Sequence, residues 1–311
     1  MAEIIVDQAT LDSVKGKVVV LAGGAQGIGA ATVGLFYESG AHVFFGDWDE
    51  TKGTKHAEEL RASVSSSGSV TYLKVNVREY QSLLSLFDAA YNKHGQIDMA
   101  ICCAAVTERP GYWEPDKLNL ESTPTGITDV IDINLNGTIY FARLAVAFLK
   151  ERHTVDPNPS SPESILSSKC ITLVSSVAGF KESPGLFAYS AAKHGVMGLM
   201  RALRPFLPPV YGLRVNAICP WATDTQLLSG VRTAWVKNLM PMNTPGDVAR
   251  YIIQVTAEPS THGKALFVTG GNAVDIEEGI NRTEPQWLGE KNSKDLNAGQ
   301  VILGLVSGFP F

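Results

Sequence analysis

The chain has 311 residues, of which 45% are hydrophobic and 18% charged, and its formal net charge is −5. A chain of this length and composition can bury a full-sized core, and its mild acidity argues against nucleic-acid binding, which needs a basic face. The four cysteines and six histidines show neither a disulfide framework nor a metal-binding spacing. We therefore predict a reduced protein without a bound metal.

The first residues do not resemble a targeting signal. The segment from Met1 to Asp7 carries an acid where a signal peptide needs bases, and its apolar run is too short. No stretch approaches the ~20 apolar residues that a membrane span requires. We expect a soluble, cytoplasmic protein that binds neither membranes nor nucleic acid.

The first part of the chain alternates short apolar runs with segments of helical periodicity. Strands are predicted at 18–22, 41–47, 70–75 and 97–102, and helices at 28–39, about 50–65 and 80–94. This alternation is typical of βαβ units with right-handed crossovers, and therefore of a parallel sheet.

The rest of the chain continues the pattern with longer loops. It gives a loop at 106–125, a long helix at 126–152, a strand at 171–174, a helix at 187–204, a strand at 213–218, a loop at 220–243, a helix from Thr244-Pro245 and a strand at 264–269. We predict one α/β Rossmann domain over 1–311, a doubly wound parallel sheet of about seven strands with helices on both faces. Its core covers about 15–275, with a surface insertion at about 153–168 and an extension at 276–311.

A glycine-rich segment follows the first predicted strand and opens the first helix. It contains Gly23, Gln26, Gly27, Ile28 and Gly29. Glycines permit a tight turn and let backbone N–H groups approach a pyrophosphate, which the helix N-terminus also attracts. A plain strand-to-helix turn is the alternative, but the position in a βαβ unit favours dinucleotide binding.

Asp47 ends the second predicted strand and indicates which dinucleotide binds. A carboxylate at this point accepts hydrogen bonds from the ribose 2′-hydroxyl of NAD(H) and repels the 2′-phosphate of NADP(H). The alternative is an acidic strand end that binds nothing. Trp48 either lies against the adenine or packs on its own helix. We predict NAD(H) as the cofactor.

Tyr189 and Lys193 lie four residues apart and so share one face of a predicted helix. A free tyrosine has a pKa of about 10, and a nearby ammonium favours its phenolate form. The Ser176 hydroxyl, which follows the fifth predicted strand, can donate to a substrate oxygen. Asn134 lies inside a predicted helix, where asparagine has poor propensity, and we expect its side chain to hold a water for Lys193. A Tyr-x-x-x-Lys pair alone is usually an exposed helix face, but its place in a cofactor-binding fold indicates catalysis.

These segments resemble the short-chain dehydrogenase/reductase family over residues 15 to about 275. The matching segments are Gly23-x-x-x-Gly27-Ile-Gly29, Asp47, Asn76-Val77, Asn134-Leu-Asn-Gly137, Ser176-Val-Ala-Gly179, Tyr189-x-x-x-Lys193 and Pro220 onward. The resemblance implies a catalytic tetrad of Asn134, Ser176, Tyr189 and Lys193. It also implies adenine contacts from Asn76 and Val77, nicotinamide contacts from Thr223 and Thr225, and a homodimer or homotetramer. Asp47-Trp48 and the tail after Asp275 further resemble a fungal branch related to 15-hydroxyprostaglandin dehydrogenase, with members in secondary metabolism.

The chain departs from the family pattern at three places. Ala22 replaces the usual threonine, Cys102-Cys103 replace two asparagines, and Trp221 replaces the glycine after Pro220. We expect the cysteines to be small buried side chains rather than a disulfide, with Cys102 contacting the cofactor through its backbone. Because the departures cluster on the cofactor side, an unusual or weak mode of NAD binding is an alternative.

The resemblance implies reversible interconversion of a secondary alcohol and a ketone. Apolar side chains in the two long loops suggest an apolar substrate, with polycyclic secondary metabolites as candidates: Trp113, Trp221, Leu227, Leu228, Trp235 and Met240. Alternatively, these side chains only close the loops on the core. Two further classes stay open: a non-redox enzyme of this fold, for dehydration, isomerisation or cyclisation, and a nucleotide-binding interaction protein without turnover.

Overall fold

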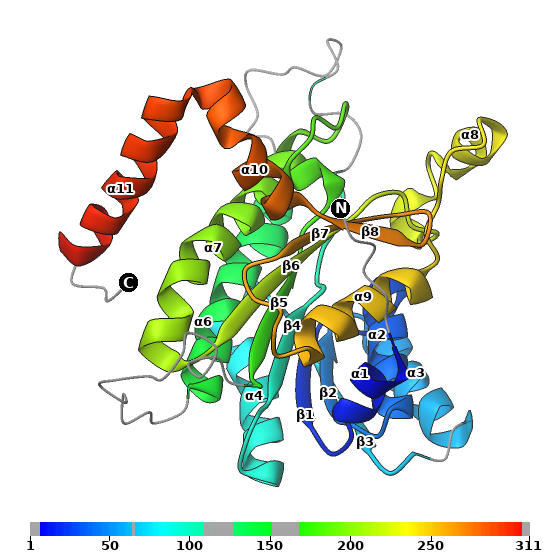
Figure 1. The fold of residues 1–311 in the computed structure, drawn as a ribbon. Helices are drawn as coiled ribbons and strands as arrows, with labels where there is room; N and C mark the ends of the chain where they lie inside the picture. The colour runs from blue at the N-terminus through cyan, green and yellow to red at the C-terminus, as the bar shows by residue number, and fades with distance from the viewer. Residues whose placement is uncertain (1–6, 64–65, 109–112, 114–126, 151–167, 307–311) are drawn as a thin grey trace, which may run out of the picture.

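A central eight-stranded sheet organises the chain, in the order β3-β2-β1-β4-β5-β6-β7-β8 (Figure 1). This computed structural model describes residues 7–63, 66–108, 113, 127–150 and 168–306, so nearly all of the predicted insertion at 153–168 lies outside the described residues. The strands are β1 (Val18–Ala22), β2 (His42–Asp47), β3 (Ser69–Lys74), β4 (Met99–Cys102), β5 (Cys170–Val174), β6 (Arg214–Pro220), β7 (Ala265–Thr269) and β8 (Asn272–Asp275).

The predicted α/β Rossmann fold is confirmed, with one added strand. Strands β1 to β7 pair in parallel, as expected, whereas β8 pairs antiparallel to β7. Gly270 and Gly271 join these two strands, with φ values of 55° and 81°. A two-residue hairpin turn of this kind needs positive φ at both central residues, which glycine adopts without strain.

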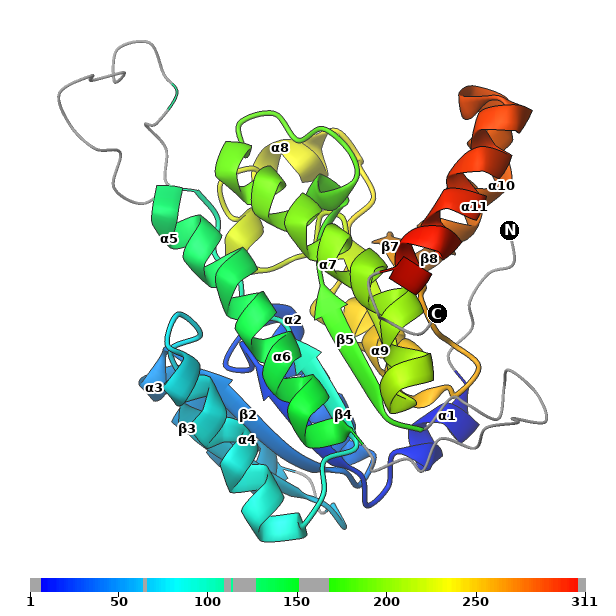
Figure 2. The ribbon, with the colours of Figure 1, turned by 90° about the vertical axis from the view of Figure 1, so that its left-hand side faces the viewer.

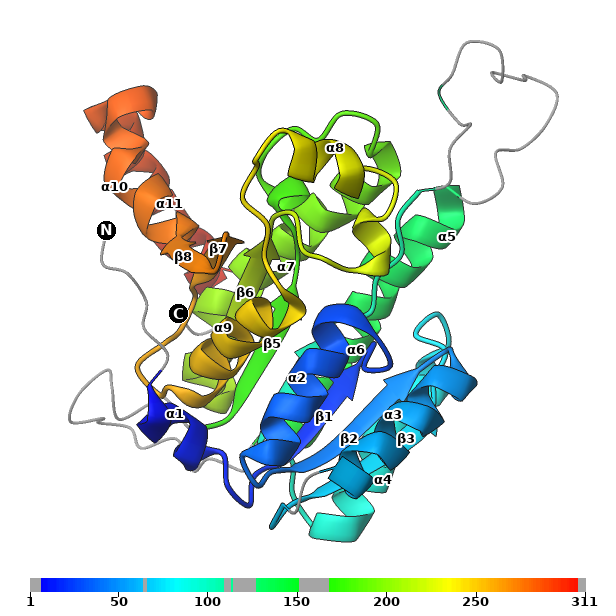
Figure 3. The same ribbon diagram turned by 90° about the vertical axis from the view of Figure 1, so that its right-hand side faces the viewer.

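Helices cover both faces of the sheet. Helices α4, α6 and α7 pack on one face (Figure 2), and α2, α3 and α9 pack on the other (Figure 3). The helices are α1 (Gln8–Ser13), α2 (Gly27–Glu38), α3 (Glu50–Ser63), α4 (Tyr80–His94), α5 (Ile127–Ile131), α6 (Gly137–Leu149), α7 (Phe187–Tyr211), α8 (Arg232–Lys237), α9 (Pro245–Ala257), α10 (Ile276–Leu288) and α11 (Glu290–Val306). Short π or 3-10 turns are η2 (Asp132–Asn136), η4 (Val177–Gly179) and η5 (Gln226–Leu228).

The core is divided by the sheet into two apolar layers. Val18 and Val20 of β1 face the layer that contains Phe87 of α4, whereas Val19 and Leu21 face the opposite layer. Because successive side chains of a strand point to opposite faces, a strand covered on both sides is apolar throughout. This explains the continuous apolar run that predicted β1.

Two predicted helices differ from the observed ones. The helix expected at 126–152 is interrupted by the π turn η2, where the N–H of Gly137 bonds to the carbonyl of Asp132. The helix expected at 187–204 continues to Tyr211 and includes Pro205, Pro208 and Pro209. Leu207, which is fully buried, packs into the core beside these prolines, so tertiary packing outweighs their poor helix propensity.

The C-terminal extension forms α10 and α11, and α11 projects away from the body of the molecule (Figure 1). Buried Glu277 anchors α10 by accepting hydrogen bonds from Arg201 Nη2 at 2.7 Å and Arg204 Nη1 at 2.9 Å, both on α7. Among the described residues, none of the helices combines the length and apolarity that crossing a membrane requires.

His262 is a half-buried side chain between α9 and β7, and both of its ring nitrogens are hydrogen-bonded. Its Nδ1 accepts from the backbone N–H of Val215 at 3.2 Å, and its Nε2 donates to the carbonyl of Arg204 at 2.8 Å. Burial lowers the pKa of His262 below its usual 6.5, and the nearby cations Arg214 and Arg204 act in the same direction. The folded protein therefore prefers the neutral ring.

This preference predicts that the protein loses stability in mild acid. Below about pH 6.5 the unfolded chain binds a proton that the folded ring resists, so the free energy of unfolding falls as pH falls. Urea unfolding at about pH 7.5 and about pH 5.5 measures the loss, and His262→Gln should reduce it. His56 and His94, whose pKa values burial also lowers, contribute the remainder. An equal loss in His262→Gln and in the exposed-site control His194→Gln would contradict this assignment.

Candidate active site

A cavity of about 1350 Å³ opens at the carboxyl ends of β1, β4, β5 and β6. The strand order reverses between β1 and β4, and such a point is where open α/β sheets bind their ligands. Most of the residues predicted to bind a cofactor line this cavity: Gly23, Gln26, Gly27, Ile28, Gly29, Asp47, Trp48, Asn76, Val77, Tyr189, Lys193, Thr223 and Thr225.

The glycines of the β1–α2 loop make room for close backbone contacts. A Cβ on Gly29 would lie 1.7 Å from the carbonyl oxygen of Gly23, and one on Gly23, whose φ is +85°, would lie 2.5 Å from the nitrogen of Ala104. Gln26, the residue before α2, makes no side-chain cap. The first N–H groups of α2 are thus available to an anion, and this cradle fits the pyrophosphate of a dinucleotide.

Asp47 is held at the edge of this loop by backbone hydrogen bonds. Its Oδ2 accepts from the N–H of Ala25 at 2.9 Å, and its Oδ1 accepts from the N–H of Asp49 at 3.0 Å. Each carboxylate oxygen retains a second acceptor position for a ribose hydroxyl. The indole of Trp48 is 67% exposed, and Lys74 Nζ lies 5.8 Å from its ring centroid. Trp48 therefore presents a large apolar surface at the cavity mouth.

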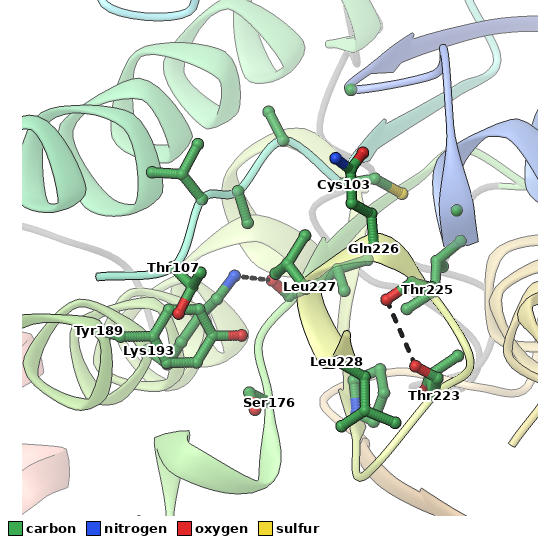
Figure 4. A pocket seen from close by; sticks show the side chains of 18 of the residues that line it. Cys103, Thr107, Ser176, Tyr189, Lys193, Thr223, Thr225, Gln226, Leu227 and Leu228 are labelled. Atoms are coloured by element: carbon green, nitrogen blue, oxygen red, sulfur yellow. Dashed lines mark hydrogen bonds between the residues drawn. The ribbon is translucent and has the colours of Figure 1, made fainter. Parts of the chain in front are cut away.

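Tyr189, Lys193 and Ser176 surround one part of the cavity (Figure 4). Lys193 is 1% exposed, and its Nζ donates to the carbonyl of Val174 at 2.9 Å. The same Nζ lies 5.6 Å from the ring centroid of Tyr189. The predicted spacing on α7 thus brings the phenol and the ammonium together.

Burial dominates the protonation of this pair. It raises the pKa of the Tyr189 phenol, while the Ser176 hydroxyl beside it acts in the opposite direction. It also lowers the pKa of Lys193 from 10.5 to about 8. The sequence predicted that Lys193 lowers the pKa of this phenol, and burial acts in the opposite direction because the phenol loses hydration in the site.

Asn134 lies in the π turn η2 and is fully buried. Its Nδ2 donates to the carbonyl of Val106 at 2.8 Å, and its Oδ1 accepts from the N–H of Val106 at 2.8 Å. The predicted inward orientation is present, and the amide pairs with the backbone of Val106. Because an amide has a second N–H and a second acceptor position, the predicted water site on this side chain stays a prediction. π turns inside helices often mark functional positions.

The two adjacent cysteines point to different environments. Cys102 is 2% exposed in the core, with its Sγ 3.6 Å from Thr138 Oγ1, and it does not line the cavity. Cys103 lines the cavity, and the predicted backbone contact of Cys102 with the cofactor stays a prediction. All four cysteines are free thiols, as predicted, and burial raises the pKa of both Cys102 and Cys103.

The apolar residues of the second long loop are divided between the cavity and the surface. Trp221, Leu227, Leu228 and Trp235 line the cavity as predicted, and the rings of Trp221 and Trp235 meet edge to face at 5.1 Å between centroids. Met240, 39% exposed, does not line it.

Trp113, from the first long loop, also lies outside the cavity lining. It packs against Phe187, with 5.0 Å between ring centroids, and is 54% exposed. Its aromatic partner Phe187 is the first residue of α7, and the predicted contact of Trp113 with the substrate stays a prediction.

Parts of the cavity wall were not predicted. They include the pair Val106 and Thr107, a few residues after β4, and the segment 182–186 before α7. Neither carries a spacing pattern typical of a binding site. Only their positions, after one central strand and before the helix that carries Tyr189, place them at the cavity.

Comparisons with known proteins agree with this site. Residues 17–235 match the short chain dehydrogenase family. The chain is similar to 5'-hydroxyaverantin dehydrogenase of Dothistroma septosporum, with 27% identity over 90% of this chain and 92% of that protein. It is 31% identical to (+)-borneol dehydrogenase 1 of Salvia officinalis, over 84% of this chain and 95% of that protein.

A solved structure shows the same fold. It is a short-chain type dehydrogenase/reductase from Mycobacterium ulcerans, with a TM-score of 0.69 and 19% identity, covering 90% of this chain and 98% of that one. The family match spans more than half of the chain and includes the glycine loop, Ser176, Tyr189 and Lys193. The chain therefore belongs to the short-chain dehydrogenase/reductase family of oxidoreductases.

Proposed function

We propose that the protein interconverts a secondary alcohol and a ketone with NAD(H) as its cofactor. The observation that carries this proposal is that Tyr189, Lys193 and Ser176 line the same cavity as the glycine cradle and Asp47. In this proposal the dinucleotide is bound at the glycine cradle and at Asp47, and its nicotinamide end lies near Tyr189, Lys193 and Ser176. When bound, the nicotinamide supplies the hydride chemistry, and the protein supplies alignment and electrostatics.

Each side chain has a separate task in this proposal. Ser176 donates a hydrogen bond to the alcohol oxygen and orients it. Tyr189 takes the hydroxyl proton at its Oη during oxidation and returns it during reduction. Protonated Lys193, near the phenol ring, opposes the effect of burial and favours the phenolate. Thr223 and Thr225, which line the cavity, hold the carboxamide of the nicotinamide.

The choice of NAD(H) over NADP(H) rests on the Asp47 carboxylate. We expect Asp47→Asn, which removes the charge and keeps the shape, to raise the affinity for NADPH relative to NADH by at least about tenfold. Fluorescence titration of both cofactors measures this ratio without a substrate. Glu59→Gln removes the same charge from exposed Glu59 of α3, outside the cavity, and should leave the ratio unchanged. An unchanged ratio in Asp47→Asn would assign the choice to other residues.

The substrate in this proposal is apolar. Trp221, Leu227, Leu228 and Trp235 form an aromatic and aliphatic wall beside the catalytic groups, and the two named relatives are dehydrogenases of 5'-hydroxyaverantin and (+)-borneol. The homodimer or homotetramer and the cytoplasmic location expected from the sequence stay predictions.

A substrate panel tests the function directly. The purified protein is incubated with NAD⁺ or NADP⁺ and (+)-borneol, 5'-hydroxyaverantin or 2-octanol, and reduced nicotinamide is followed by absorbance. Turnover with NAD⁺ supports the proposal. Conversion without any cofactor would instead indicate non-redox chemistry, and cofactor binding without product from any alcohol or ketone would indicate an interaction protein.

A further inference from the structure

We propose that Glu108 is a positioning residue that holds Tyr189 in place through the backbone at the start of α7. The carboxylate of Glu108 accepts hydrogen bonds from the N–H of Ala188 at 2.8 Å and from the N–H of Tyr189 at 3.3 Å. The two partners lie 80 and 81 residues away in the sequence. This inference rests on the proposed function, in which Tyr189 is the general base.

Helix α7 depends on this carboxylate because it has no cap of its own. The residue before it, Leu186, has no side-chain acceptor for the first N–H groups. Helix α9, by contrast, begins with a local capping box of Thr244 and Asp247. A carboxylate at a helix N-terminus satisfies unpaired donors and favours the helix dipole. Here one of those donors belongs to the catalytic residue itself.

The other end of this connection is also fixed. Two residues before Glu108, both backbone groups of Val106 are hydrogen-bonded by the buried amide of Asn134. A continuous series therefore runs from η2 to Val106, along the backbone to Glu108, and from its carboxylate to Tyr189. Thr107, between Val106 and Glu108, lines the cavity together with Tyr189. The segment 106–108, which follows strand β4, thus connects this strand to the catalytic helix α7.

The series gives Asn134 a task that its geometry supports. Its side chain fixes the loop that carries Glu108, so a member of the tetrad acts here on the position of Tyr189 through the protein backbone. A small displacement of a catalytic group lowers the rate steeply, because proton and hydride transfer need aligned atoms. Loss of the Glu108 carboxylate should thus lower kcat rather than cofactor affinity.

The experiment compares Glu108→Ala, Glu108→Gln, Asp247→Ala and Tyr189→Phe. Glu108→Gln keeps one acceptor oxygen, and Asp247→Ala removes a capping carboxylate from α9, outside the cavity. For each variant we measure kcat and KM with the best alcohol of the panel, the dissociation constant of NADH, the thermal midpoint, and amide hydrogen exchange at residues 187–190.

Glu108→Ala is expected to lower kcat by about tenfold or more, with the NADH dissociation constant unchanged within about twofold and faster exchange at residues 187–190. Glu108→Gln should recover part of the rate, and Asp247→Ala should keep kcat despite a lower thermal midpoint. Unchanged exchange in Glu108→Ala, no recovery in Glu108→Gln, or an equal loss of kcat in Asp247→Ala would overturn the positioning role. Full turnover by Glu108→Ala with an inactive Tyr189→Phe overturns this role alone, whereas full turnover by Tyr189→Phe overturns the proposed function.

Discussion

Tyr189→Phe is expected to lower kcat by about 10²- to 10⁴-fold, which is the contribution of a positioned acid–base group. The variant keeps the ring beside Lys193 and removes only the hydroxyl that exchanges a proton with the substrate. The NADH dissociation constant should stay within about twofold of that of the parent protein, because an interaction that forms only in the transition state affects kcat and not cofactor binding. Initial rates of nicotinamide reduction and a fluorescence titration provide the two numbers.

The matched control for this variant is Tyr140→Phe. Tyr140 lies on α6, is 36% exposed and packs edge to face on Tyr80, outside the cavity. Removal of its hydroxyl should leave kcat unchanged. If Tyr189→Phe retained the turnover of the parent protein, the phenol would not be the base, and the assignment of the reaction would lose its main support.

Gly29→Ala is expected to abolish cofactor binding or to prevent folding. The new Cβ would lie 1.7 Å from the carbonyl oxygen of Gly23. No side-chain rotation can relieve this contact, because the backbone fixes the position of the Cβ and the oxygen belongs to the backbone. The loop must then move away from the start of α2, and overpacking of this kind costs about 1–3 kcal/mol or more. We expect the NADH dissociation constant to rise at least about a hundredfold, since phosphate contacts depend on the position of this loop.

Gly198→Ala separates this effect from a general intolerance of substitution. Gly198 is an exposed residue of α7, and a Cβ there meets no atom within 4 Å. Alanine should stabilise the helix by up to about 1 kcal/mol and leave cofactor affinity unchanged. Calorimetric titration with NADH and urea unfolding measure both quantities. Gly29→Ala that binds NADH like the parent protein would show that the loop is not the pyrophosphate site.

The most accurately predicted elements are those whose first and last residues are both marked by the sequence, through a change of apolar spacing or a capping residue. Helix α4 is observed at Tyr80–His94, as predicted, because its apolar spacing stops at Gly95, which adopts a left-handed φ of 73°. Strand β8 was missed because only two of its four residues, Ala273 and Val274, are apolar. Helices α10 and α11 follow this strand and were missed with it. The π turn was missed because one extra residue does not alter a helical periodicity visibly.

The site residues that the sequence predicted are likewise those with a local pattern. The glycine cradle, Asp47, and the Tyr189–Lys193 pair follow from local spacing and were found. Glu108 could not be found, because its partners on α7 are 80 residues or more away and a single acid in a loop has no distinctive pattern. Which of Cys102 and Cys103 lines the cavity depends on the sides that their side chains take at and just after the end of β4, and this requires the three-dimensional register.

The π turn makes chain length part of the catalytic arrangement. An α-helix advances by about 100° per residue, so deletion of a single residue within 132–136 would restore a regular helix and rotate the preceding segment about the helix axis. Asn134 would then face away from Val106, although every side chain of the tetrad would still be present. A variant that keeps all the catalytic residues but has one residue fewer in this turn should have a damaged site. Substitutions at positions of the turn other than Asn134 should be tolerated better than a change in its length.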